Sequence, residues 1–451
     1  MVTQIKPAPS SAASNARAWT RILAHYREPN SARSIFEIVI TAGPFVLLWT
    51  VMWATLSAGY WLCLLLAVPT AGFLVRLFMI QHDCGHGSFF RHRLANDWVG
   101  RVIGVLTLTP YDFWRRTHAR HHAASGNLDR RGMGDVDTLT VREYLALSRG
   151  RRIGYRLYRH PVVMFGFGPA YLFIMRHRLP VGLMRSDWQP WLSTMATNAA
   201  IALLVAMMMS LVGVGPFLRV HLPITLLAAS IGVWLFYVQH QFEHTFWAQD
   251  RSWNLHEAAL HGSSHYDLPG VLRWFTANIG VHHVHHLCSH VPYYRVNQVL
   301  RDHPELGAIG RLTLRKSIEC VRLVLWDESQ RRLISFSEMH CRWDVTPARR
   351  ALQEGCARRR IYTLWAGSWM GRFSMTLSTM PKSLAISAVR SVSRVPLQGV
   401  LDLLQRMAGM PHVNLDGPIV DQCATAAGTE SCGRWFFVAK NLKQRHRGGL
   451  P

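Results

Sequence analysis

Three segments of the chain carry histidines at helical spacing: His82-Asp83-Cys84-Gly85-His86, His118-Ala119-Arg120-His121-His122 and His282-His283-Val284-His285-His286. Side chains three or four residues apart lie on the same face of a helix. Each segment therefore presents two or three imidazoles to one side, a pattern typical of metal ligands. Because a tetrahedral zinc ion takes only four ligands, the eight histidines predict more than one metal ion. They are His82, His86, His118, His121, His122, His282, His285 and His286.

Four apolar windows surround these segments. They form two pairs, residues 38–56 with 58–75 and residues 191–211 with 222–238. Each window is close to the ~20 residues that span a bilayer core. A buried helix would explain any one of them, but four windows in two pairs favour membrane spans. The sequence therefore predicts an all-α integral membrane protein with four transmembrane helices arranged as two hairpins.

The order of windows and histidine segments predicts that all three segments share one side of the membrane. The first two segments lie between the second and third windows, and the third follows the fourth. Two intervening spans return the chain to the side it left. The net charge is +24, and arginines such as Arg130 and Arg131 concentrate in segments flanking the windows. The positive-inside rule explains this charge without nucleic acid. It predicts a cytoplasmic helical cap that holds the metal site.

The remaining sequence divides the chain into three parts. Residues 1–34 are a polar, cytoplasmic N-terminal segment without a secretory signal. Residues 35–344 form the membrane domain with its catalytic cap. Residues 345–451 are a basic extension without a sustained span, which we expect to be poorly ordered. A fused electron-transfer domain is the alternative, but no haem or iron–sulfur pattern supports it. The eight cysteines contain no CxxC pair, which fits a reducing compartment.

Two shorter apolar pieces, residues 99–108 and 162–174, lie within the membrane domain. Both are too short to cross a bilayer comfortably, so we expect interfacial helices. Two extra spans there would leave the parity of the topology unchanged. Arg176 and Arg178, which follow the second piece, are placed to meet anionic headgroups.

The histidine segments and their flanks resemble the three histidine boxes of the membrane fatty acid desaturases. The flanks Phe236-Tyr237-Val238-Gln239-His240-Gln241-Phe242-Glu243 and Gly262-Ser263-Ser264-His265-Tyr266-Asp267-Leu268-Pro269 are similar to the acyl-lipid, omega-6 or delta-12 branch. The resemblance covers residues 35–344. It implies a non-haem di-iron centre that activates O2 and removes two hydrogens from an acyl chain. Electrons would come from an external ferredoxin-like or cytochrome-type donor.

The resemblance also implies the ligand set. The eight box histidines are expected to bind the two iron ions, for which neutral imidazole is a suitable ligand. A ninth ligand is expected at the end of the fourth window, where we favour His240 over His244. His283 points away from the ligand face, so we expect a structural role, and His265 is a weaker candidate. Carboxylates that could orient the ligands are Asp83, Asp135, Asp137, Glu243 and Asp267, and Asp137→Ala is expected to lower iron occupancy or activity.

The predicted function is oxygen-dependent desaturation of an acyl chain, of the delta-12 or omega-6 type, on membrane lipids. The substrate is expected to reach the irons through an apolar tunnel, and the partners are the acyl lipid, membrane lipids and an electron-transfer protein. A membrane di-iron hydroxylase or ketolase acting on a lipid, alkane or carotenoid uses similar boxes and is the alternative. A metal transporter or zinc hydrolase is a third hypothesis, which iron content would exclude.

Overall fold

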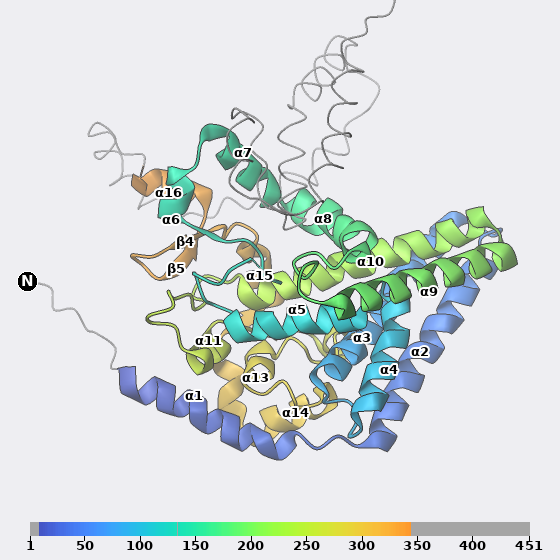
Figure 1. Cartoon of the computed structure of the whole chain (residues 1–451), viewed down its shortest axis with the longest axis horizontal. Coiled ribbons are helices and arrows are strands. Elements are labelled where there is room, and N and C mark those ends of the chain that lie inside the picture. The colour runs from blue at the N-terminus through green and yellow to red at the C-terminus, as the bar shows by residue number, and fades with distance from the viewer. Residues whose placement is uncertain (1–8, 133, 344–451) are drawn as a thin grey trace, which may run out of the picture. The chain divides into compact units, whose positions relative to one another are not determined.

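A computed structural model of the chain describes residues 9–132 and 134–343, and these residues are mainly helical (Figure 1). Four of the described helices are long and apolar enough to cross a membrane: α2 (Ser31–Ala54), α3 (Tyr60–His86), α9 (Trp188–Val212) and α10 (Val214–His240). α2 and α3 form one hairpin, and α9 and α10 meet at Gly213, whose φ of 86° ends one helix before the next begins. The prediction of an all-α fold with four spans in two hairpins is confirmed.

Two of these helices continue past the last residue of their apolar window and end at a histidine. α3 continues past residue 75 to His86, and α10 continues past residue 238 to His240. Gly87, which has a φ of 69°, stops α3 directly after His86 by taking the left-handed conformation that glycine adopts without strain. The ends of both helices therefore carry candidate ligands beyond the apolar part of the span.

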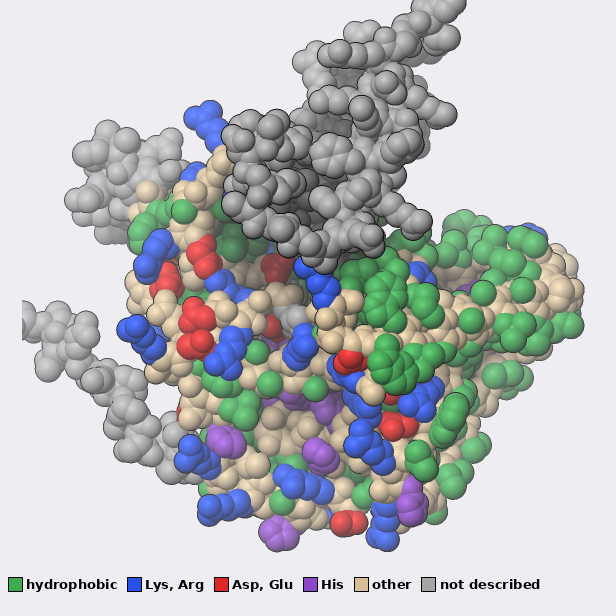
Figure 2. Space-filling view, in the orientation of Figure 1, with side chains coloured by type: hydrophobic (Ala, Val, Ile, Leu, Met, Phe, Trp, Pro, Cys, Tyr) green, Lys and Arg blue, Asp and Glu red, His purple; other side chains and the backbone are tan. Residues whose placement is uncertain are grey.

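α3 is the central helix of the bundle. It packs against α2, α10 and the following helix α4 (Arg93–Leu106). In α3, 56% of the most apolar stretch is buried inside the protein, whereas in α9 the buried share is 6%. Hydrophobic side chains cover the surface over α9 and α10, and charged side chains gather at the other end of the molecule (Figure 2). This separation fits a bundle whose outer surface meets lipid at one end only.

The segments between α4 and α9 lie beside the spans. α5 (Tyr111–Ala124), α6 (Val141–Ala146) and α7 (Arg149–Tyr158) are ordinary helices, so the helix expected in residues 99–108 is present at the end of α4. The piece 162–174 instead contains two π-helical turns, η2 (Val163–Phe167) and η3 (Tyr171–Met175), on either side of α8 (Gly168–Ala170). Pro169 lacks a backbone N–H, which favours such a break in the regular bonding. The 3-10 turn η4 (Arg176–Arg178) ends this piece.

The chain beyond α10 consists of short elements. Its helices are α11 (Leu255–His261), α12 (Gly270–Phe275), α13 (His282–Leu287), α14 (Tyr293–Asp302), η5 (Pro304–Ala308), α15 (Leu314–Cys320) and α16 (Phe336–Trp343). Five short strands were not predicted: β1 (Leu139–Thr140), β2 (His265–Asp267), β3 (Arg311–Thr313), β4 (Leu325–Asp327) and β5 (Arg332–Ile334). β4 pairs with β1 in parallel and with β5 in antiparallel orientation, and β2 pairs with β3 in parallel. Strands of two or three residues are too short to show an alternating pattern in the sequence.

The N-terminal segment, expected to be polar, contains α1 (Pro9–Leu23) and the turn η1 (Ala24–Tyr26). α1 packs against α11 and α13, and it buries Ala16 and Leu23 completely. The tyrosine hydroxyl of Tyr26 donates to Asp302 of α14 at 2.8 Å. The N-terminal residues therefore pack against α13, the helix that carries the third group of box histidines. The C-terminal extension predicted for residues 345–451 lies outside the described residues.

A buried ion pair joins the first hairpin to the rest of the fold. Arg76 of α3 and Glu37 of α2 are 2% and 1% exposed and bind each other. Arg76 also donates to Thr41 at 3.2 Å and to the Trp274 carbonyl, and Tyr293 donates to Glu37 at 3.1 Å. The charges are thus compensated on every side, as a charge inside an apolar bundle requires.

We predict that Glu37→Leu lowers the stability of the purified protein by about 3–5 kcal/mol, because it leaves the Arg76 guanidinium buried without its counter-ion. Replacing both partners, in Glu37→Leu with Arg76→Met, should restore most of the loss. The control is Arg33→Gln, which removes the exposed partner of Glu37 and should cost less than about 1 kcal/mol. Thermal unfolding in detergent measures all three. Equal losses for Glu37→Leu and Arg33→Gln would contradict the prediction.

Candidate metal centre

The structure brings the three histidine segments and His240 together in two groups. One group consists of five residues, His82, His86, His118, His122 and His285, and the other of four, His121, His240, His282 and His286. Within each group the candidate ligand atoms all lie within 4.8 Å of one another. All nine predicted ligands therefore belong to a group that could hold a metal ion, and no predicted ligand lies elsewhere.

Four helices deliver these side chains. His82 and His86 lie on the last turns of α3, and His240 is the last residue of α10. α5 carries His118, His121 and His122, and α13 carries His282, His285 and His286. Both α5 and α13 divide their histidines between the two groups. The groups are therefore adjacent, and the second one depends on α10 reaching as far as His240.

The Nε2 atoms face one another at short distances. In the first group the Nε2 atom of His118 lies 3.1 Å from that of His82 and 3.2 Å from that of His122. In the second group the Nε2 atom of His240 lies 3.2 Å from that of His121 and 3.0 Å from that of His282. At a metal–nitrogen bond of about 2.1 Å, two nitrogens at right angles around one ion lie about 3.0 Å apart. The spacing fits imidazoles arranged around a common cation.

Three of the histidines are oriented through their other ring nitrogen. The Nδ1 atom of His121 lies 2.5 Å from Asp135, and that of His240 lies 3.1 Å from the Gly262 carbonyl. The Nδ1 atom of His82 lies 3.2 Å from Asp83, whose other oxygen accepts from the Tyr293 N–H at 2.7 Å. Donation from Nδ1 leaves the Nε2 lone pair free to bind a metal.

Two of the five predicted orienting carboxylates are thus in place, Asp83 and Asp135. In the described residues the other three make no hydrogen bond to any of the nine histidines. Asp267 binds Arg311 at 2.6 Å, and Glu243 binds Arg332 at 3.2 Å. Asp137 lines a cavity instead. Asp135, two residues earlier, makes the histidine contact instead, and the effect of Asp137→Ala on iron occupancy or activity stays a prediction.

The other histidines near the boxes have structural roles. The Nε2 atom of His283 bonds to the Leu306 carbonyl at 2.9 Å, which confirms the prediction made for it. The Nδ1 atom of His265 bonds to the Gly307 carbonyl at 2.6 Å. His265 and His244 belong to neither group. These contacts fix the loop between α14 and β3 against the helix that carries the third segment.

Burial favours the neutral form of five of the candidate ligands outside the spans. It lowers their pKa values, and the neighbouring imidazoles lower them further; these are His118, His122, His282, His285 and His286. Neutral imidazole is the form that binds metals. In addition, the Nε2 atom of His86 is buried without a hydrogen-bond partner in the described residues. Imidazole donors suit iron, copper, nickel or zinc and do not suit calcium or magnesium.

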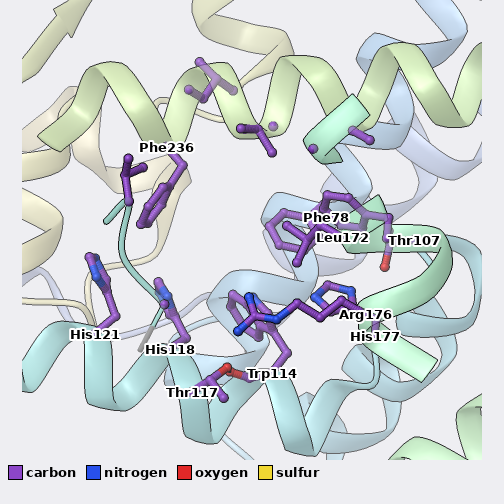
Figure 3. A pocket seen from close by; sticks show the side chains of 18 of the residues that line it. Phe78, Thr107, Trp114, Thr117, His118, His121, Leu172, Arg176, His177 and Phe236 are labelled. Atoms are coloured by element: carbon purple, nitrogen blue, oxygen red, sulfur yellow. The ribbon is translucent and has the colours of Figure 1, made fainter. Parts of the chain in front are cut away.

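An apolar cavity of about 430 Å³ opens onto the histidines (Figure 3). His82, His118, His121 and His282 line one part of it, and the rest follows α3 and α10 into the bundle. Trp114, one helical turn before His118, stacks on its ring with centroids 4.6 Å apart. The sequence analysis did not single out Trp114, although its spacing of four residues from His118 places it on the same helix face.

Comparisons with known proteins identify the family of this chain. The sequence model of the family "Fatty acid desaturase" matches residues 56–316. The chain is 43% identical over 318 residues to a fatty acid desaturase of Bacillus subtilis (strain 168), covering 70% of this chain and 90% of that protein. It is 26% identical over 272 residues to an sn-1 oleoyl-lipid 12-desaturase of Anabaena variabilis, covering 54% of this chain and 69% of that protein. It is also 25% identical over 247 residues to a chloroplastic omega-6 fatty acid desaturase of Spinacia oleracea, covering 50% of this chain and 50% of that protein.

Four apolar helices, with histidines gathered where α3 and α10 end, define a membrane protein with a candidate metal centre, and the matching family is one of oxidoreductases. The chain belongs to the fatty acid desaturase family.

We predict that Gly280→Ala destabilises the protein by about 1–3 kcal/mol and displaces the third histidine segment. A Cβ atom at this position would lie 2.4 Å from the Tyr266 carbonyl oxygen, a backbone atom in β2 that cannot move aside cheaply. The matched control is Gly270→Ala, whose Cβ would meet nothing within 4 Å. Melting temperatures measure the effect. A Gly280→Ala protein as stable as the Gly270→Ala protein would show that this close approach does not position α13.

Proposed function

We propose that this desaturase uses O2 and two iron ions held by nine histidines to introduce a double bond into an acyl chain. The first ion would be held by the group of five and the second by the group of four. The observation that supports this most directly is the convergence of both sets of Nε2 atoms beside an apolar cavity. A hydrocarbon chain in that cavity would lie next to both groups.

The irons, when bound, supply the oxidising power that hydrogen removal from an unactivated methylene requires. The chain's own residues do the positioning. Phe236 and Trp114 contact His121 and His118 and line the cavity, where they exclude water. Asp135 holds the Nδ1 proton of His121 and so keeps Nε2 available as a ligand. Electrons would come from an external ferredoxin-like or cytochrome-type protein.

We infer that the reaction is of the delta-12 or omega-6 type and acts on acyl groups of membrane lipids. The named activities of the relatives from Anabaena variabilis and Spinacia oleracea support this position and lipid class. We also propose that the catalytic face is cytoplasmic. The arginines of α7 and those after α3 lie in segments between the second and third candidate spans, where the positive-inside rule expects the cytoplasm.

Expression in a bacterial host supplied with oleate tests this function. We expect dienoic fatty acids to accumulate in the presence of oxygen and to be absent without it. The control is His240→Gln, which removes the imidazole that bridges His121 and His282 and should abolish the product. A hydroxylated fatty acid would instead identify the hydroxylase alternative. No change in fatty acids, with the protein present in the membrane, would refute the proposal.

Asp135→Asn is predicted to lower iron affinity by about 10–100-fold, because His121 loses the carboxylate that orients its ring. The matched control is Glu243→Gln, since Glu243 lies three residues after His240 but is exposed and binds Arg332. Iron content after dialysis against a chelator series measures the difference. Equal retention of iron by both variants would show that the Asp135 contact does not support the metal.

A further inference from the structure

One part of the cavity lining is positively charged and unpaired. The turn η4 contributes Arg176 and His177 to the lining. Figure 3 shows both on the side of the cavity away from His118 and His121, with the Arg176 side chain pointing inward near Trp114. In the described residues, Arg176 forms no ion pair, and its Nε atom is buried without a hydrogen-bond partner. A guanidinium in that position lacks the anion that usually accompanies it.

His177 adds a second unpartnered nitrogen. It is 8% exposed, and its Nδ1 atom has no hydrogen-bond partner in the described residues. Burial, followed by the charges of Arg178 and Arg176, lowers its pKa to about 3, so the ring is neutral at pH 7. The ring also bonds to the Leu108 carbonyl, which takes the one N–H of the neutral form, so Nδ1 is an acceptor only. An anion on this part of the wall would therefore be held by Arg176 and not by His177.

Arg178, the third residue of η4, makes a different set of contacts. Arg178 donates to Asn198 of α9 at 2.6 Å, and the Asn198 side chain donates back to the Arg178 carbonyl at 2.9 Å. It also binds the Leu108 carbonyl. Arg178 thus ties the turn to a candidate membrane span, and this use corrects the expectation that it meets headgroups. The contact leaves Arg176 beside the bilayer and free to bind a ligand.

Asp137 is the carboxylate that competes for Arg176. It lines the same cavity, and burial raises the pKa of its carboxyl, while the charge of Arg176 is the largest of the influences that lower this pKa. The two side chains form no ion pair in the described residues. The Arg176 guanidinium therefore faces a carboxyl whose burial favours the neutral form, and it can still bind an anionic ligand.

We propose that Arg176 forms an anion site that holds the phosphate of an acyl phospholipid while its acyl chain occupies the apolar cavity. The assignment rests on the proposed function for the identity of the acyl chain. The site itself follows from the guanidinium without an ion-pair partner in the described residues and from its place on the cavity wall. It would fix one end of the substrate relative to the histidines, and so would help to set which methylene lies beside them.

Equilibrium binding in neutral detergent tests the site without turnover. The holoenzyme is kept free of oxygen and reductant, and the labelled probes are dioleoylphosphatidylglycerol and dioleoylglycerol, which share acyl chains but differ in the phosphate. We expect the protein to bind the phospholipid about tenfold more tightly, the range of a hydrogen bond to a charged group. Arg176→Gln should remove this preference, and Arg176→Lys should retain part of it.

The matched control is Arg185→Gln, which removes the same charge from an exposed residue outside the cavity. It should bind like the unaltered protein. Equal affinities of the unaltered protein for the two lipids, or an unchanged preference in Arg176→Gln, would overturn the proposal. Displacement of the phospholipid by excess inorganic phosphate would overturn it as well, because the site would then take free phosphate. Phospholipid preference in a protein that forms no double bond would leave the anion site standing and refute only the desaturase function.

Discussion

Imidazole nitrogens that converge from four helices are the constraint on which the rest of this structure depends. Several Nε2 atoms face each other at hydrogen-bond distance, and in His121 and His240 the Nδ1 proton is already engaged by Asp135 and Gly262. Lone pairs that face one another repel. A cation at the centre of each group turns this repulsion into attraction, so metal binding and folding are coupled in our account.

The architecture follows from that requirement. α3 and α10 run beyond their apolar windows, and both end at a histidine of the site. The short pairing of β2 with β3, and the close approach of Gly280 to Tyr266, hold the third segment against them. The cavity then runs from the histidines between the same two helices. α3 and α10 thus each carry candidate ligands, a candidate membrane span and part of the cavity wall.

Much of this could be predicted from the sequence because its signals are periodic or long. Helical spacing identified the box histidines, and the even number of spans between them predicted that they share one side, as their convergence confirms. The finer details have no such signal. Asp135 and Asp137 lie two residues apart in one loop, and only the direction of each side chain decides which meets His121. In the same way, packing against Asn198 separates the role of Arg178 from that of Arg176. Strands of three residues leave no pattern at all.

Anomalous X-ray scattering from crystals of the iron-loaded protein tests the central claim most directly. Data collected on both sides of the iron absorption edge locate iron and distinguish it from zinc. Our account predicts two iron peaks in each chain, one inside the group of five histidines and one inside the group of four. A single peak, or a peak present only at the zinc edge, would contradict it.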